Sequence, residues 1–170
     1  MKETLLAVCL ACHGAGGVSQ TPLTPSLGGQ PSFFVVAQLF LFREQRRDNV
    51  LMNSMAKDLK DADLQALADL ISKLPPPPRP EGKPDAAKFN SGKSLLAKNN
   101  CAGCHGTDFS GDNNVPRIAN QREDYLLKAL RDYKSGRRVG YGNAAMPETV
   151  SGLKDAELAD LAYALSMFGR

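Results

Sequence analysis

The stretch Cys9-Leu10-Ala11-Cys12-His13 returns later in the chain, in the same pattern, as Cys101-Ala102-Gly103-Cys104-His105. The 170-residue sequence holds four cysteines and two histidines, and these two motifs use all six of them. No cysteine or histidine is left over for any other site. The chemistry of the two motifs therefore decides what kind of fold and function the chain can have.

The pattern C-x-x-C-H is the attachment signature of c-type haem. The two thiols add to the two vinyl groups of the porphyrin, and the two intervening residues let one helical turn span that edge. The imidazole that follows then binds the iron. We therefore predict two haem c groups, each with its own iron. The expected attachment and iron-binding residues are Cys9, Cys12, His13, Cys101, Cys104 and His105.

Three other uses of paired cysteines fit less well. Zinc sites of four cysteines usually have their pairs about 15–20 residues apart, whereas these motifs begin at residues 9 and 101. A thioredoxin-like redox pair belongs in a βαβ context, and the sequence has no such strand pattern. Structural disulfides would leave the histidine after each pair unexplained.

The similarity between the two halves extends well beyond the motifs. Each motif is followed by a polar loop and a Pro-x-aliphatic-x-x-Gln segment, then by an amphipathic segment that ends in two arginines. A loop that contains methionine then leads into Leu-Lys-Asp-Ala-Asp/Glu-Leu and a closing helix, which apolar residues with a 3.6-residue period indicate. The repeated segments are residues 25–30 and 116–121, 33–47 and 125–138, and 59–64 and 153–158.

A proline-rich segment, Leu-Pro-Pro-Pro-Pro-Arg-Pro-Glu-Gly-Lys-Pro at residues 74–84, separates the halves. Proline fixes φ and removes an amide donor, so this segment cannot continue a helix and favours an extended backbone. We predict an all-α fold with a domain at residues 1–74, a linker at 75–85 and a second domain at 86–170. Domains this small seldom bury enough apolar surface to be stable alone, and a haem would complete each core.

The second axial ligand of each iron cannot be histidine, which leaves methionine, lysine, the N-terminus or an open position. Methionine is favoured because Met/His ligation occurs in cytochromes c and raises the reduction potential. Met146 stands seven residues before Leu153, and Met52 stands seven residues before the corresponding Leu59. Counting from the paired arginines selects Met55 instead of Met52. We predict Met146 for the second haem and Met52, with Met55 as the competitor, for the first.

With these features the chain resembles the dihaem cytochrome c4 family. The resemblance rests on the tandem C-x-x-C-H motifs, the Pro-x-aliphatic-x-x-Gln segments, Arg-Arg-Asp-Asn-Val-Leu-Met at residues 46–52 and Met-x6-Leu-Lys-Asp-Ala-Asp/Glu-Leu in both halves. It covers essentially the whole chain. It implies two tandem class I cytochrome c domains, each wrapped around a covalently attached haem, with an approximate two-fold relation and the haems near the domain interface.

The resemblance also implies a role for two prolines. The carbonyls of Pro25 and Pro116 would accept the Nδ1–H of His13 and His105, which would orient each imidazole and increase its basicity. Ordinary loop rigidity is the alternative explanation of these prolines.

The function that the resemblance implies is electron transfer in the periplasm, not catalysis. The redox partners would be a dehydrogenase as donor and an oxidase or another cytochrome as acceptor. We expect a signal peptide or an anchor upstream, because haem c attachment of this type resembles that of exported proteins. Residues 1–11 are not that signal, since their apolar stretch is short and contains a haem-binding cysteine.

Two alternatives remain. The chain could be the cytochrome subunit of a flavin-, quinoprotein- or sulfur-oxidising dehydrogenase complex. Phe33 and Phe34 would then suit a docking face, although core packing is the simpler interpretation. A dihaem enzyme with one open iron site is less favoured, because each half offers a credible methionine.

Composition excludes other classes of protein. The net charge of +3 is spread along the sequence, whereas a nucleic-acid binder usually has a denser basic face. No run of about 18 apolar residues is present, so no transmembrane segment is predicted.

The basic residues form two clusters, one before each methionine. Three interpretations remain open: helix ends whose cations complement the helix dipole, partners of haem propionates, or groups that steer an acidic redox partner. The clusters are Arg43, Arg46 and Arg47, and Lys134, Arg137 and Arg138.

Overall fold

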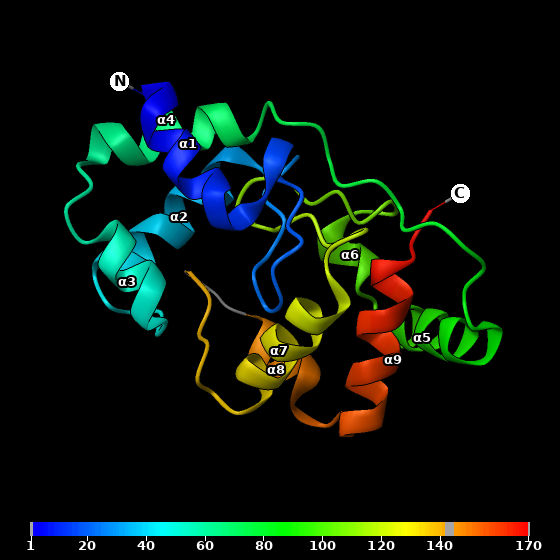
Figure 1. The fold of residues 1–170 in the computed structure, drawn as a ribbon. Helices are drawn as coiled ribbons and strands as arrows, with labels where there is room; N and C mark the ends of the chain where they lie inside the picture. The colour runs from blue at the N-terminus through cyan, green and yellow to red at the C-terminus, as the bar shows by residue number, and fades with distance from the viewer. Residues whose placement is uncertain (1, 142–144, 170) are drawn as a thin grey trace.

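The computed structural model describes residues 2–141 and 145–169, and helices dominate that part of the chain (Figure 1). The first half contains α1 (Lys2–His13), the 3₁₀ turn η1 (Ala15–Gly17), α2 (Ser32–Arg43), α3 (Val50–Ala56) and α4 (Asp61–Ile71). The second half contains α5 (Ala86–Lys98), α6 (Ala102–His105), α7 (Glu123–Lys134), α8 (Ala145–Ser151) and α9 (Asp155–Ser166). Within the described residues the only β pairing is an isolated bridge, so the predicted all-α class is confirmed.

The closing helices α4 and α9 begin in the same way. The carboxylate of Asp63 accepts a hydrogen bond from the backbone N–H of Lys60 at 2.9 Å, and Glu157 accepts one from Lys154 at 2.7 Å. These acidic side chains in the first turn also complement the positive end of the helix dipole. The repeated Leu-Lys-Asp-Ala-Asp/Glu-Leu sequence is therefore a helix-start signal used twice.

Each half has its own hydrophobic cluster. The apolar faces predicted for the closing helices are buried in these clusters, so that Leu64 and Leu67 lie in the first and Leu158 and Leu161 in the second. The second cluster contains more buried residues than the first. Two cores of this kind agree with two small domains, and the domain bounds of 1–74 and 86–170 remain our proposal. Residues 1 and 170 of those domains lie outside the described residues.

Helices α5 and α9 approach each other very closely at Gly92. A Cβ atom at this position would lie 2.2 Å from the carbonyl oxygen of Asp160 and 2.5 Å from the Cβ of Ala164. Real Cβ atoms do not come this close to other heavy atoms, so the crossing depends on the missing side chain.

The proline-rich segment runs along the outside of the molecule from α4 to α5 (Figure 1). Near its start, the carbonyl oxygen of Pro75 lies so close to Gly28 that a Cβ there would be 2.0 Å away. Further along, the carbonyl of Pro77 accepts a hydrogen bond from Asn120 Nδ2 at 3.4 Å, and Arg79 Nε donates one to the carbonyl of Met167 at 3.2 Å. The segment is thus attached first to one half and then to the other.

Candidate functional site

The residues of the two motifs occupy equivalent places in the two halves. The first motif forms the last turns of α1, and the second begins just before α6 and ends with it. The proline of each Pro-x-aliphatic-x-x-Gln segment lies in the loop that follows, and each predicted methionine lies on a short helix, α3 or α8. The short helices are a difference from the sequence prediction, which placed the methionines in loops.

The two motif histidines are buried, and each is held through Nδ1. His13 Nδ1 lies 2.8 Å from the carbonyl oxygen of Pro25, and His105 Nδ1 lies 3.0 Å from that of Pro116. A carbonyl can only accept, so Nδ1 carries the proton and Nε2 keeps the lone pair with which a histidine binds metal. Both contacts that the resemblance implied are therefore present.

Burial lowers the pKa of His13 and of His105, and the hydrogen bond to the carbonyl offsets only part of that effect. Both rings are therefore neutral at pH 7. A neutral imidazole with a fixed tautomer is the form that binds a metal ion.

The four cysteines all lie in the described residues and form no disulfide. Cys12 and Cys104 are exposed, whereas Cys9 and Cys101 are half-buried. Burial raises the pKa of the two half-buried thiols. Each motif thus presents two thiols, three residues apart on helical backbone, beside a histidine.

In the first half, Met52 and not Met55 faces the cavity that His13 lines. Met52 lines that cavity together with Cys9, and it packs against the first hydrophobic cluster. Met55 is 44% exposed and is not among the cavity residues. The side chain of Asn49 caps α3 by accepting a hydrogen bond from the backbone N–H of Met52 at 2.9 Å. This cap fixes the first turn of α3, which carries Met52.

In the second half, Met146 lines a cavity together with Cys101, Cys104 and His105. Met146 is in the first turn of α8, and the residues just before it, 142–144, lie outside the described ones. Met146 and His105 also line the cavity of the first half. The two cavities therefore adjoin each other where the two halves meet.

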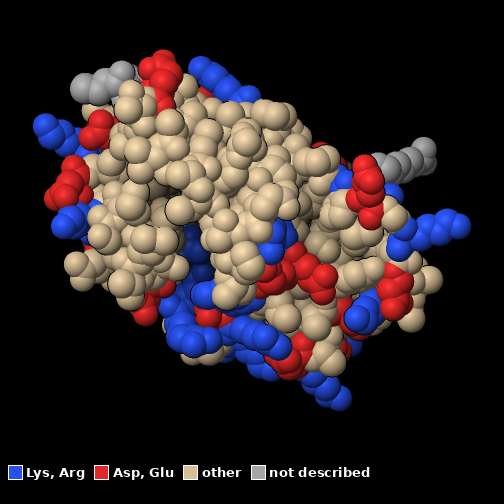
Figure 2. All heavy atoms as spheres, in the orientation of Figure 1, with Lys and Arg blue, Asp and Glu red and all other residues tan. Residues whose placement is uncertain are grey.

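Arg47 and Arg138, one from each basic cluster, line the first cavity and donate to the same side chain. Figure 2 shows basic side chains inside a hollow and on the surface beside it. Arg47 donates to Gln38 Oε1 at 2.5 Å and to the hydroxyl of Tyr125 at 3.0 Å, and Arg138 donates to the same Gln38 oxygen at 3.3 Å. Arg43 differs, because it forms ion pairs on the surface.

Arg47 and Arg138 each have an aromatic neighbour but no ion-pair partner among the described residues. Each guanidinium packs 4.6 Å from an aromatic ring centre, and neither forms an ion pair with a carboxylate in residues 2–141 and 145–169. Although burial raises the pKa of Tyr125, the two guanidiniums lower it to about 8. Asp48 and Asp132 also line this cavity, but neither pairs directly with these two guanidiniums. Two largely buried cations without an ion-pair partner favour an anionic ligand, because buried charges are normally paired.

These features fit a haem in each half. Haem brings two vinyl groups for the thiols, an iron for a neutral imidazole and a thioether, and two carboxylates that suit the unpaired guanidiniums. The sequence alone did not identify Gln38 and Tyr125 as part of this site. Arg47 and Arg138 were singled out only as members of their basic clusters.

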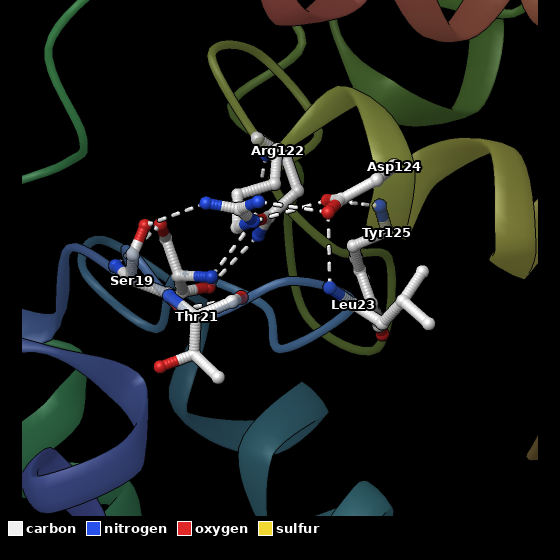
Figure 3. A network of polar contacts seen from close by, with 8 residues as sticks. Ser19, Thr21, Leu23, Arg122, Asp124 and Tyr125 are labelled. Atoms are coloured by element: carbon white, nitrogen blue, oxygen red, sulfur yellow. Dashed lines mark hydrogen bonds and ion pairs between the residues drawn. The ribbon is translucent and has the colours of Figure 1, made fainter.

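A further network of polar contacts joins the two halves (Figure 3). Arg122 forms an ion pair with Asp124 at 2.7 Å, and Asp124 accepts a hydrogen bond from the backbone N–H of Leu23 at 3.0 Å. Arg122 mainly accounts for the lowered pKa of the Asp124 carboxyl. The contact with Ser19, whose carbonyl accepts from Arg122 at 3.4 Å, also crosses between the halves.

Comparison with known proteins finds relatives over the whole length of the chain. The family model described as cytochrome c matches residues 89–165. A cytochrome c4 of Thiocapsa roseopersicina is 34% identical over 162 residues, which cover 89% of this chain and 82% of that protein. A protein of Thiomonas intermedia described as a thiosulfate dehydrogenase electron acceptor is 32% identical over 169 residues, covering 94% of this chain and 78% of that protein.

A solved structure is similar to the fold as a whole. The cytochrome c4 structure of Acidithiobacillus ferrooxidans superposes with a TM-score of 0.84 at 29% identity, covering 95% of this chain and 99% of that one. None of the described helices of this chain is both long enough and apolar enough to cross a bilayer.

Proposed function

The chain belongs to the cytochrome c4 family and transfers single electrons by means of two haem c groups; we propose that it does so in the periplasm, with a sulfur-oxidising dehydrogenase as donor. The electrons would leave to an oxidase or another cytochrome. The observation that carries this proposal is the repetition of one set of groups at two adjoining cavities: a two-cysteine motif, a carbonyl-bound histidine and a methionine.

We propose the following assignment of the groups that hold the haems. The thiols of each motif form the thioether bonds, the motif histidine binds one face of the iron, and a methionine binds the other. Bound in this way, each haem supplies a reversible one-electron couple. The assigned residues are Cys9, Cys12, His13 and Met52 in the first half and Cys101, Cys104, His105 and Met146 in the second.

The surrounding residues have separate tasks in this proposal. The carbonyls of Pro25 and Pro116 fix the tautomer and direction of the histidines. Arg47 and Arg138 hold the carboxylates of the haems with charge-assisted hydrogen bonds. The apolar residues that line both cavities exclude water, and the low polarity around a haem is one of the means by which a protein sets its potential.

The visible spectrum tests this assignment directly. We expect both haems to be low-spin in the oxidised and in the reduced protein, and we expect carbon monoxide to leave the reduced spectrum unchanged, because methionine fills the sixth position of each iron. Absorption spectra of the oxidised, reduced and carbon-monoxide-treated protein measure this. A haem that binds the gas readily would overturn one methionine assignment and favour an enzyme with an open iron.

The choice of a sulfur-oxidising dehydrogenase as the partner has two supports. The Thiomonas intermedia relative is described as the electron acceptor of thiosulfate dehydrogenase. The second support is an exposed apolar patch on α3, next to Met52, in which Val50 is 86% and Leu51 is 60% exposed. Exposed apolar patches on soluble proteins often mark the places where other proteins dock.

We expect Leu51→Lys to slow reduction by thiosulfate dehydrogenase about tenfold, because a charge buried at an interface costs on the order of 1.4 kcal/mol or more. The potentials of both haems should stay unchanged, since Leu51 lies outside the cavities. Stopped-flow kinetics with the purified enzyme measure the rate. Ser94→Lys, which adds the same charge on the exposed side of α5, is the matched control. Equal rates for the two variants would argue against docking at α3.

A further inference from the structure

The glutamine that ends each Pro-x-aliphatic-x-x-Gln segment reaches across to the other half. Gln121 accepts a hydrogen bond from the backbone N–H of Ser26 at 2.7 Å and donates one to the Ser26 carbonyl at 2.8 Å. Gln30 accepts from the N–H of Arg117 at 3.1 Å and donates to its carbonyl at 2.9 Å. The two glutamines are 4% and 5% exposed, so water does not compete for these bonds.

Each glutamine thereby holds the peptide group that orients the histidine of the other half. The carbonyl of Pro25 and the N–H of Ser26 belong to a single planar peptide unit. Its oxygen accepts from His13 Nδ1, and its N–H donates to Gln121 Oε1. In the other half, the peptide between Pro116 and Arg117 is held between His105 and Gln30 in the same way.

Hydrogen bonds on the two ends of one peptide unit reinforce each other. An N–H that donates to a good acceptor makes the carbonyl of the same unit a better acceptor, because successive dipoles polarise one another. The glutamine also fixes the plane of the peptide, so the carbonyl oxygen stays directed at the histidine. Both effects strengthen the bond from Nδ1–H, which increases the basicity of the imidazole.

We propose that Gln30 and Gln121 are positioning residues that act crosswise. Gln121 sets how strongly the imidazole of His13 donates its electron pair to the iron, and Gln30 does the same for His105. The inference rests on the proposed function, because it takes both histidines as iron ligands. A more basic imidazole stabilises the ferric iron and lowers the potential. Removing a glutamine amide therefore raises the potential of the haem in the opposite half.

The test is to measure each haem separately in the dihaem protein. We expect Gln121→Met, which keeps the approximate volume of the side chain but not its polar atoms, to raise the potential of the haem at Cys9 and Cys12. The shift at the haem of the second half should be less than half as large. Gln30→Met should give the reverse. Redox titration followed by NMR of the assigned haem methyl groups gives both potentials.

A second measurement reports on the histidines themselves. In the reduced protein, Gln121→Met should move the Nδ1–H resonance of His13 and speed its exchange with solvent, and should leave that of His105 nearly unchanged. Gln121→Glu retains an acceptor for the Ser26 N–H, so it should remove the upward shift of the potential. This variant also keeps the test decisive if the methionine variant folds poorly.

A purely structural role gives a different pattern. If the glutamines only hold the two halves together, either substitution changes both haems alike, or it changes the haem of its own half. Either result would overturn the crosswise assignment, as would an absence of any shift. Phe33→Ala is the control for a looser interface, because it removes the ring contact of Phe33 with Tyr141 without touching either peptide unit. It should leave both Nδ1–H resonances in place.

Failure of this inference can be told apart from failure of the proposed function. If the haems are six-coordinate and do not bind carbon monoxide, but the shifts are not crossed, only the role of the glutamines is wrong. If a haem of the unmodified protein binds the gas, the ligand assignment itself is wrong.

Discussion

Met146→Ala is expected to lower the potential of the second haem by on the order of 0.1 V and to open its iron to carbon monoxide. The potential falls because the identity of the axial ligands sets the potential of haem over a range of about 0.8 V. A thioether stabilises ferrous iron, and water or hydroxide in its place does not. Among the described residues, Met146 is the only methionine that lines the second cavity. A redox titration followed by absorbance, with and without carbon monoxide, measures both effects.

The other methionines provide matched comparisons. Met52→Ala should have the same effect on the first haem, whereas Met55→Ala should have little, since Met55 faces outward. Met167 is a buried methionine outside both cavities, so Met167→Ala should cost stability without changing the spectrum. If Met55→Ala instead let the first haem bind carbon monoxide, Met55 would replace Met52 as its ligand. Gas binding caused by Met167→Ala would in the same way replace Met146 by Met167.

Gly92→Ala is expected to lower the free energy of unfolding by about 2–3 kcal/mol, in the range found for overpacked cores. This sign is opposite to the usual one, because alanine normally stabilises a helix interior by roughly 0.5–1 kcal/mol relative to glycine. The new Cβ would meet the backbone of Asp160 and the side chain of Ala164 and would force α5 away from α9. Thermal unfolding of the dihaem protein, followed by circular dichroism, should show a midpoint lower by roughly 5–10 °C.

Gly152→Ala is the control, because nothing lies within 4 Å of a Cβ at that position. It should leave the midpoint unchanged or raise it slightly. A rise in stability with Gly92→Ala would mean that the two helices separate easily, and that their close approach is not required by the fold.

The features that could be predicted from the sequence are those encoded locally. The C-x-x-C-H motifs predict the cofactor, and the spacing of Leu64 and Leu67, or of Leu158 and Leu161, identifies the buried face of a closing helix. Such patterns depend only on the geometry of one helix. The all-α class and the tandem organisation followed from them and are confirmed by the fold and by the relatives.

The features that could not be predicted depend on what the other half presents. Arg47 and Arg43 are alike in sequence, yet one turns into the cavity and the other pairs with Asp61 on the surface. The simpler interpretation of Phe33 as a core residue is wrong, since its ring is exposed and meets Tyr141 of the second half. The glutamines were visible as a repeated residue, but their partners lie 87 and 95 positions away.

The proline-rich segment also has a consequence for how firmly the two halves must bind each other. Much of the interface consists of hydrogen bonds between loops, such as those of the two glutamines, and contacts of this kind would hold separate chains only weakly. A short connection that is attached to both halves makes their meeting intramolecular, and short linkers produce effective concentrations in the millimolar range. This effective concentration does not depend on the concentration of the protein, so the halves stay together at any dilution. The contacts between them therefore need not be strong, and they can position the histidines.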